Sequence, residues 1–145
     1  MSLQILRSPE EVRETIAKAR AGGQLIGFVP TMGYLHEGHA TLMRKAAEMA
    51  GIVVVSIFVN PLQFGPNEDF ERYPRDLDHD LEVASRAGAT HVFYPSAELL
   101  TPKDLQVMVE PGPMAEVLCG RSRPGHFRGV CTIVTKLFNI VQPDF

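Results

Sequence analysis

Two histidines, His36 and His39, stand three residues apart in the segment PTMGYLHEGH, which covers residues 30–39. An imidazole donates hydrogen bonds to phosphate oxygens and can carry a proton during a reaction. Gly33 and Gly38 allow the backbone of this segment to approach a ligand closely. A zinc site of the H-E-x-x-H type is excluded, because it requires histidines four residues apart. A phosphate-binding pair and a pair of solvated or structural histidines remain as interpretations.

The elements around this segment favour phosphate binding. A short apolar run, residues 25–29, predicts a strand buried on both faces, and Pro30 is expected to end it. Apolar residues at helical spacing then predict a helix that continues to Gly51. In a parallel α/β sheet, the loop between such a strand and helix lies at the carboxyl end of the strand. The helix N-terminus there offers unpaired N–H groups and a partial positive charge, and both suit phosphate.

The neighbouring segments predict further alternation of strands and helices. Residues 8–11, Ser-Pro-Glu-Glu, have the pattern of a capping box, and the helix that follows is expected to end at Gly22-Gly23. Residues 52–59 are almost wholly apolar and predict a central parallel strand. A helix near residues 75–87 and a strand around residues 90–94 complete the order β, α, β, α, β.

The C-terminal third of the chain has weaker patterns. Residues 105–110 alternate as a further strand, and residues 113–118 predict a short helix. Residues 130–142 carry apolar side chains at helical spacing and predict a buried helix. No change in composition marks a linker. We therefore expect one doubly wound, parallel α/β domain over residues 1–145, with ligands beyond the carboxyl ends of its strands.

Composition narrows the class of protein. The 145 residues are 45% hydrophobic, which is typical of one globular domain. A net charge of -3 without a dense run of Lys and Arg argues against a nucleic-acid partner. No apolar run approaches the roughly 20 residues that a membrane helix needs, so we expect no membrane partner and a cytoplasmic location. Cys119 and Cys131 lack metal-ligand spacing and are expected to be reduced and structural.

Three further blocks follow the histidine segment in order: SIFVNPLQFG at residues 56–65, YPR at residues 73–75 and RPGHFRG at residues 123–129. With PTMGYLHEGH they resemble the pantothenate synthetase family, which has a Rossmann-like fold of the HxGH-type nucleotidylyltransferase superfamily. The chain has neither a G-x-x-x-x-G-K-[ST] phosphate loop nor a G-x-G-x-x-G fingerprint, so P-loop ATPases and ordinary dinucleotide-binding dehydrogenases lose their main support.

The resemblance implies an AMP-forming ligase that makes an amide bond. In that family ATP activates the carboxylate of pantoate as an acyl adenylate with release of pyrophosphate. The amine of β-alanine then attacks to give pantothenate and AMP, and Mg2+ accompanies the nucleotide. The family precedent is a homodimer. The resemblance makes His39 the candidate proton donor and His36 the second catalytic histidine, within an ATP-contacting loop of Met32, Gly33, Tyr34, Leu35, His36, Glu37, Gly38 and His39.

The resemblance also implies substrate-binding residues. Gln63 is expected to contact both pantoate and β-alanine, and Asn60 is either a second contact or a turn former before Pro61. The further substrate-binding candidates are Thr31, Tyr73 and His126. Asp80 matches a metal-associated aspartate of the family, although an acidic residue also stabilises the start of a helix. The arginines of residues 120–129 form either a loop over an anionic substrate or a plain basic surface.

The chain departs from the family at its end. Family members continue past the V-x-P-D block, residues 141–144 here, into another strand, a G-E-K-D segment, a mobile loop and a second domain that acts as a lid. We therefore expect an N-terminal domain without its lid, which retains part of both ligand sites and is weak or inactive as a synthetase. The alternatives are another HxGH nucleotidylyltransferase, which moves AMP onto a phosphate-bearing acceptor, and an inactive fragment that binds ATP and pantoate.

Overall fold

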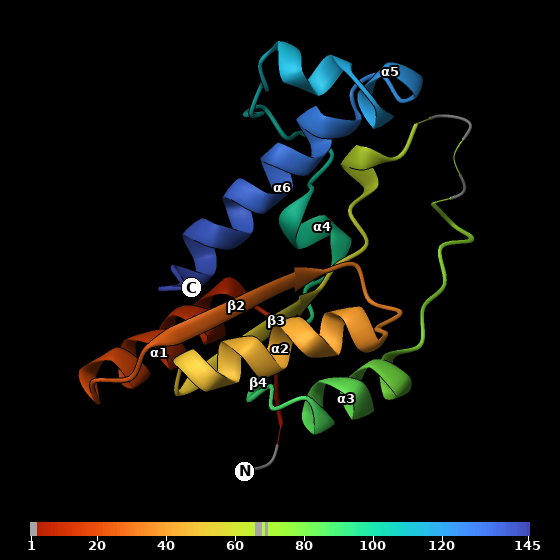
Figure 1. Ribbon diagram of the computed structural model, residues 1–145. Helices are drawn as coiled ribbons and strands as arrows, with labels where there is room; N and C mark the ends of the chain where they lie inside the picture. The colour runs from red at the N-terminus through yellow and green to blue at the C-terminus, as the bar shows by residue number, and fades with distance from the viewer. Residues whose placement is uncertain (1–2, 66–67, 69) are drawn as a thin grey trace.

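The computed structural model describes residues 3–65, 68 and 70–145, and within them a small sheet lies among helices (Figure 1). The strands are β1 (Gln4–Leu6), β2 (Ile26–Thr31), β3 (Ile52–Ile57) and β4 (His91–Phe93). The longer helices are α1 (Pro9–Ala21), α2 (Glu37–Met49), α3 (Leu77–Arg86) and α6 (His126–Val141). Shorter helical segments are η1 (Pro61–Gln63), α4 (Ala97–Leu100), η2 (Pro113–Glu116) and α5 (Cys119–Ser122).

The sheet is parallel throughout, with the strand order β1-β4-β3-β2. β3 lies in its interior, where Val54 is opposite Phe28 of β2 and His91 of β4. The predicted central strand is therefore confirmed, although it ends at Ile57. The parallel strands and intervening helices form the Rossmann-like, doubly wound arrangement that the sequence predicted.

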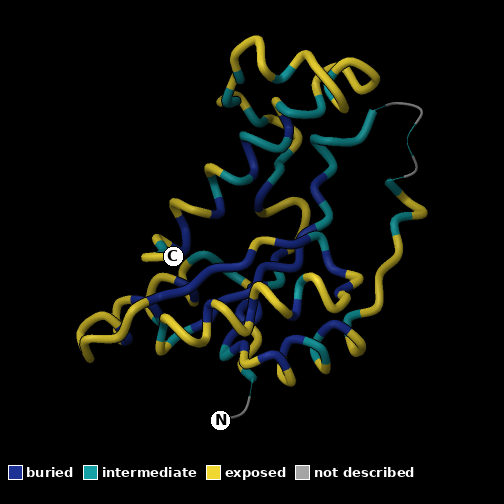
Figure 2. The backbone as a smooth tube through the Cα atoms, in the orientation of Figure 1, coloured by how far each residue is buried: buried dark blue, intermediate teal, exposed yellow. Residues whose placement is uncertain are grey.

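Helices cover both faces of the sheet (Figure 1). Alternate residues of β3 point to opposite faces, as in any strand. Val54 joins the apolar cluster of α1 and α6, whereas Val53 and Val55 join the cluster of α2 and α3. Figure 2 shows the consequence: β3 and β4 are almost wholly buried, and the helices expose their outer sides. None of the described helices has the length and apolar character needed to cross a membrane.

The capping box at the start of α1 is confirmed. Ser8 Oγ accepts from Glu11 N at 3.2 Å, and a Glu11 carboxylate oxygen accepts from Ser8 N at 3.3 Å. These bonds satisfy two N–H groups that have no partner inside the helix. The helix ends at Ala21, before the predicted Gly22-Gly23 stop.

Pro30 lies inside β2, so the prediction that it ends the strand is wrong. Phe28 N donates to Phe145 O at 3.0 Å, on the side of β2 that faces away from β3. Residue 30, two positions along, has the same orientation, and its missing N–H therefore costs no bond to β3. Phe145 N in turn donates to Ile26 O at 3.2 Å, so this residue runs along the outer edge of β2.

Residues 105–110 form no strand, contrary to the prediction. Val109 N donates instead to Thr132 Oγ1 of α6 at 2.9 Å, so this part of the segment bonds to a helix. α6 begins at His126, four residues before the predicted start at Val130, directly after Gly125 with its positive φ of 81°. The sequence did not predict β1, α4 or α5, each of which has only three or four residues.

Ser56 provides a test of the core. It is fully buried in β3, and its Oγ has no hydrogen-bond partner among the described residues. We predict that Ser56→Ala raises the free energy of unfolding by about 1 kcal/mol in chemical denaturation, because it removes an unsatisfied buried hydroxyl. Thr132→Val is the control and should destabilise by about 1 kcal/mol, since Thr132 Oγ1 donates to Arg128 O at 2.7 Å. A destabilised Ser56→Ala protein would contradict this assignment.

Candidate functional site

The loop between β2 and α2 is fixed by side-chain hydrogen bonds and by its backbone conformation. Thr31 Oγ1 donates to Ser56 O at 2.8 Å and accepts from Gly33 N at 3.1 Å. Gly33 and Tyr34 have positive φ angles of 83° and 52°, and Leu35 after them is buried. A Cβ at Gly33 would lie 2.8 Å from an Asp80 carboxylate oxygen. Glycine is therefore required at residue 33 for space as well as for backbone conformation.

His36 and His39 cap the N-terminus of α2 through reciprocal hydrogen bonds. His36 Nδ1 accepts from Gly38 N at 3.1 Å, and His39 Nδ1 accepts from His36 N at 3.3 Å. The two ring centroids are 4.1 Å apart. A neutral imidazole whose Nδ1 accepts carries its proton on Nε2, so we assign the Nε2–H tautomer to both rings. Two ring N–H donors therefore lie at the N-terminus of a 13-residue helix, an arrangement suited to phosphate oxygens.

The electrostatics of His39 agree with this tautomer. Burial lowers the pKa of His39 below its ordinary value of 6.5, and the neighbouring His36 lowers it further. Asp80 opposes the shift with a smaller effect. The ring is therefore mainly neutral at pH 7, and its Nδ1 remains available as the acceptor that the cap requires.

We predict that the protein loses stability as the pH falls below 6.5, the ordinary pKa of histidine. Burial lowers the pKa of His91 as well, so at both sites the unfolded chain takes up protons before the folded chain does. The stabilisation is therefore present above 6.5 and is lost as the pH falls through the lowered folded values. Thermal denaturation between about pH 7.5 and about pH 5.5 checks this. His39→Gln should show a shallower loss, and an equal loss in both proteins would argue against the His39 contribution.

A second group of polar side chains follows β3. Asn60 is buried, and its Nδ2 donates to Gln63 Oε1 and to Gly129 O, both at 3.1 Å. Its Oδ1 accepts from Leu62 N at 3.2 Å. Because Asn60 engages the Gln63 carbonyl oxygen, Gln63 presents its NH2 group as a donor. Asn60 is thus both the predicted turn former and the group that orients Gln63.

His126, the first residue of α6, joins this group. Its Nδ1 lies 2.9 Å from Gln63 O, and since a carbonyl oxygen only accepts, the ring nitrogen donates. Nε2 of the neutral ring is then an acceptor. Gln63 and His126 line a cavity of about 380 Å³ that also contains Arg123 and Glu68. The fold therefore brings together two predicted substrate-binding residues that lie 63 positions apart in the chain.

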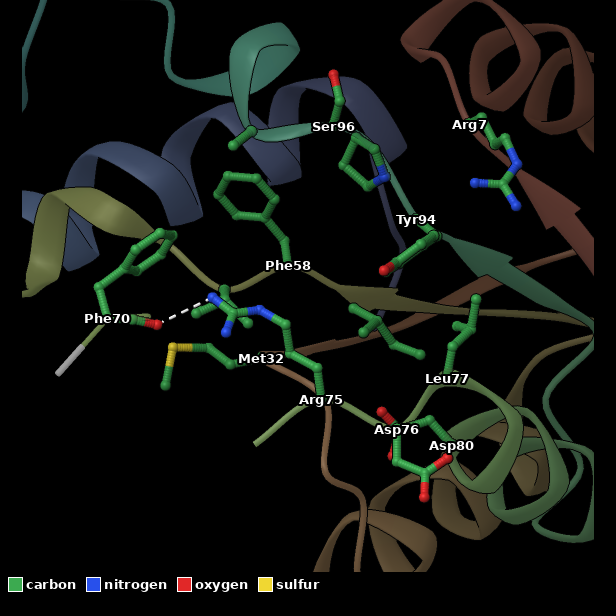
Figure 3. Close-up of a pocket in the computed structure, with 15 residues that line it drawn as sticks. Arg7, Met32, Phe58, Phe70, Arg75, Asp76, Leu77, Asp80, Tyr94 and Ser96 are labelled. Atoms are coloured by element: carbon green, nitrogen blue, oxygen red, sulfur yellow. Dashed lines mark hydrogen bonds between the residues drawn. The ribbon is translucent and has the colours of Figure 1, made fainter. Parts of the chain in front are cut away.

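A larger cavity of about 450 Å³ lies beyond the carboxyl ends of the strands (Figure 3). Met32 lines it after β2, Phe58 after β3 and Tyr94 after β4. Arg7, after β1, has its guanidinium 5.6 Å from the centroid of the Tyr94 ring. Of the predicted ATP-contacting loop, Met32 and Gly33 are among the residues that line this cavity, and His36 and His39 are not.

Comparison with known proteins identifies the family. The family model described as pantoate-beta-alanine ligase matches residues 4–145, which is nearly the whole chain. The chain belongs to this ligase family. A relative named pantothenate synthetase from Fervidobacterium nodosum is 56% identical over 141 residues, and the match covers 97% of this chain but 50% of the relative. A relative of the same name from Pelotomaculum thermopropionicum is 58% identical over 135 residues, with 93% and 48% covered.

Solved structures of ligase-family proteins have the same fold. Pantothenate synthetase from Thermus thermophilus matches with a TM-score of 0.88 at 43% identity, covering 97% of this chain and 49% of that one. Pantoate-beta-alanine ligase from Francisella tularensis, solved with beta-gamma ATP and beta-alanine, also has a TM-score of 0.88, at 40% identity, with 98% and 54% covered. The chain therefore spans about half the length of the relatives that it matches.

Three further residues that were predicted to contact ATP or substrate, Tyr34, Glu37 and Tyr73, lie in different surroundings. Tyr34 and Glu37 are exposed, and Glu37 pairs with Arg44 of the same helix. Tyr73 is half-buried with its ring centroid 5.9 Å from that of Phe64, and burial raises the pKa of its hydroxyl, with a further contribution from Asp80. A neutral tyrosine hydroxyl donates a hydrogen bond, which is compatible with the predicted substrate contact.

The described residues do not form a protein cage for Mg2+. They include no group of three or more His, Cys, Asp or Glu side chains placed to hold a metal ion. Asp80, the predicted metal-associated residue, is 1% exposed, and both of its carboxylate oxygens accept hydrogen bonds from backbone N–H groups. These bonds place the Asp80 carboxylate against the loop backbone, and a Mg2+ ion usually keeps several waters besides one or two carboxylates.

Sequence reasoning missed several residues around the cavities. Arg7 and Tyr94 follow the paired strands β1 and β4, and only the sheet order places them at the same edge as Met32. In the predicted arginine loop, Arg123 forms an ion pair with Glu68, Nε to Oε1 at 2.7 Å, and Arg128 forms one with a Glu110 oxygen at 2.9 Å. These two arginines are therefore already neutralised by carboxylates. In the sequence, the block RPGHFRG drew attention to these arginines, but it did not show which carboxylates they pair with.

Proposed function

We propose that this chain supplies the nucleotide-binding part of a ligase that condenses pantoate with β-alanine. In the first step the pantoate carboxylate attacks the α-phosphate of ATP, which forms pantoyl-adenylate and releases pyrophosphate. In the second step the β-alanine amine attacks the acyl carbon, which forms the amide of pantothenate and releases AMP. Membership of the ligase family supports the reaction. The reciprocal histidine cap of α2 is the single observation on this chain that carries the ATP site.

The loop between β2 and α2 together with His36 and His39, here called the histidine loop, is the ATP-binding part of this proposal. The first step brings an anionic carboxylate against an anionic phosphate, so catalysis depends on positioning and on neutralisation of developing charge. The Nε2–H groups of His36 and His39 and the N-terminal amides of α2 donate toward the phosphates. His39 also donates a proton to the leaving oxygen when it acts as imidazolium, a minor form at pH 7 that its lowered pKa makes a stronger acid than ordinary imidazolium.

The group around Gln63 is the acyl-acceptor part of the proposal. The Gln63 NH2 group donates to pantoate and afterwards lies near the incoming β-alanine. His126 Nε2 accepts from a hydroxyl of pantoate, because its Nδ1–H is held by Gln63 O. Thr31 supports the histidine loop through its bond to Ser56 O, and Tyr73 supplies a hydroxyl donor. Asn60 keeps Gln63 in this orientation.

Titration calorimetry of the 145-residue chain tests the proposal. We expect binding of ATP and of pantoate, and slow pantoate-dependent exchange of pyrophosphate into ATP, because the relatives are about twice as long. Gln63→Ala should weaken pantoate binding and leave ATP binding unchanged, whereas His36→Ala should weaken ATP binding. Gln106→Ala, at an exposed position, is the control. Exchange that follows a phosphate-bearing acceptor instead of pantoate would replace this function by that of another HxGH nucleotidylyltransferase.

A homodimer and a cytoplasmic location belong to the same proposal. Large apolar side chains are exposed on the segment that contains η2 and α5, and they need cover from another surface. Their exposed fractions are 78% for Val107, 87% for Met114 and 86% for Leu118. Sedimentation of the chain at several concentrations should show a dimer, and a monomer at every concentration would contradict this part of the proposal.

A further inference from the structure

Asp80 binds the backbone of the histidine loop from the neighbouring helix α3. Its Oδ2 accepts from Tyr34 N at 2.9 Å, and its Oδ1 accepts from Leu35 N at 2.6 Å. The two amides are consecutive, so the carboxylate holds the loop with both oxygens. Asp80 is 1% exposed, and it lies in the first turn of α3, 45 positions away from Leu35 in the chain.

α3 also holds the other side of Leu35. His79 Nε2 lies 3.0 Å from Leu35 O, and since a carbonyl oxygen only accepts, the ring donates. His79 N in turn donates to Asp76, the N-cap of α3, at 3.0 Å. Both backbone groups of Leu35 are therefore bonded to two adjacent side chains of a well-capped helix. The loop is held between α2, which begins at Glu37, and the start of α3.

The turn that these bonds hold is unfavourable by itself. Tyr34 has a φ of 52°, a conformation that side-chain-bearing residues rarely adopt. Leu35 N is buried, so without an acceptor it would carry the cost of an unsatisfied donor. Hydrogen bonds from an amide to a carboxylate are stronger than those between neutral groups. The Asp80 carboxylate is therefore suited to stabilise the left-handed turn immediately before the His36 cap.

We propose that Asp80 is a positioning residue, which fixes the Gly33–Tyr34 turn and thereby directs His36 and His39, and that it is not a Mg2+ ligand. Each carboxylate oxygen already accepts from a backbone amide, and the side chain is 1% exposed, which leaves little room for a Mg2+ ion that usually keeps several waters. The contact with Gly33 agrees, because any Cβ at that residue would displace Asp80 Oδ2. This inference rests on the proposed function only in one respect, namely that ATP is the ligand of His36 and His39.

Amide hydrogen exchange of the 145-residue chain, followed by NMR, tests the backbone contact directly. In Asp80→Asn the side chain keeps one acceptor and loses its charge, so exchange at Tyr34 N or Leu35 N should accelerate about ten- to a hundredfold. Asp78→Asn removes the same charge from an exposed position in the same helical turn, and it should leave both rates unchanged. Unchanged exchange in Asp80→Asn would overturn the proposal, as would equal acceleration in Asp78→Asn.

ATP titrations with and without Mg2+ separate positioning from metal binding. A positioning residue predicts that Asp80→Asn weakens ATP binding by the same factor in both conditions. A weakening confined to the titration with Mg2+ would overturn the proposal in favour of a metal ligand. If the wild-type chain binds no ATP at all, the proposed function fails, and the exchange rates at Tyr34 and Leu35 still decide the role of Asp80.

Discussion

Replacing Gly129 by alanine is expected to lower the free energy of unfolding by about 3 kcal/mol or more. A Cβ on Gly129 would overlap the carbonyl group of Leu62 and would lie 2.8 Å from Gln63 N, and all of these are backbone atoms. Backbone cannot move aside as a flexible side chain can, so α6 and η1 would have to separate. The hydrogen bond from Asn60 Nδ2 to Gly129 O would be lost or stretched as well. Urea denaturation measures the change.

Gly112→Ala is the matched control for this experiment. A Cβ on Gly112 would meet no atom within 4 Å among the described residues, and the φ of -74° at this position is ordinary for alanine. The control should therefore leave the unfolding midpoint almost unchanged. Where Gly129→Ala still folds, pantoate binding should fall, because Gln63 and His126 lie on the two elements that the new methyl group pushes apart. Equal stability of the two variants would contradict the close packing of α6 on η1.

Replacing His39 by alanine is expected to slow pantoate-dependent exchange of pyrophosphate into ATP by about a hundred- to ten-thousandfold. The reason is the loss of a ring N–H donor and proton source at the N-terminus of α2. Because the chain spans about half of its relatives, the assay uses residues 1–145 fused to the C-terminal half of the Fervidobacterium nodosum relative. The same fusion with His39 intact supplies the reference rate.

His39→Gln separates chemistry from capping. Its Oε1 can still accept from His36 N, so we expect the melting temperature to stay closer to wild type than in His39→Ala. Glutamine cannot supply a proton, however, and exchange should be about as slow as in the alanine variant. Leu42→Ala, at an exposed position of the same helix, controls for an unspecific effect on α2. Exchange restored by glutamine would refute the proton-donor role of His39.

Local patterns in the sequence were sufficient for the main elements of the fold. The capping box at Ser8, the apolar run of β3 and the helical spacing in α2 and α6 all report short-range backbone preferences, and the structure confirms that these elements form. The strand expected at residues 105–110 was wrong, because alternation alone does not supply a partner strand. The prediction that Pro30 ends the strand was wrong because its missing N–H faces the side of β2 that has no neighbouring strand among the described residues, and the sequence does not show which side that is.

In the functional site, too, some features follow from the sequence and others depend on the tertiary structure. The order strand, PTMGYLHEGH and helix was enough to place His36 and His39 at a helix N-terminus, because that geometry follows from adjacent residues. Contacts between distant segments were decided only by the tertiary structure: Asp80 on the amides of residues 34 and 35, and His126 on Gln63 O. A side-chain hydrogen bond depends on where the closed fold puts its partner, and neither hydropathy nor spacing contains that information.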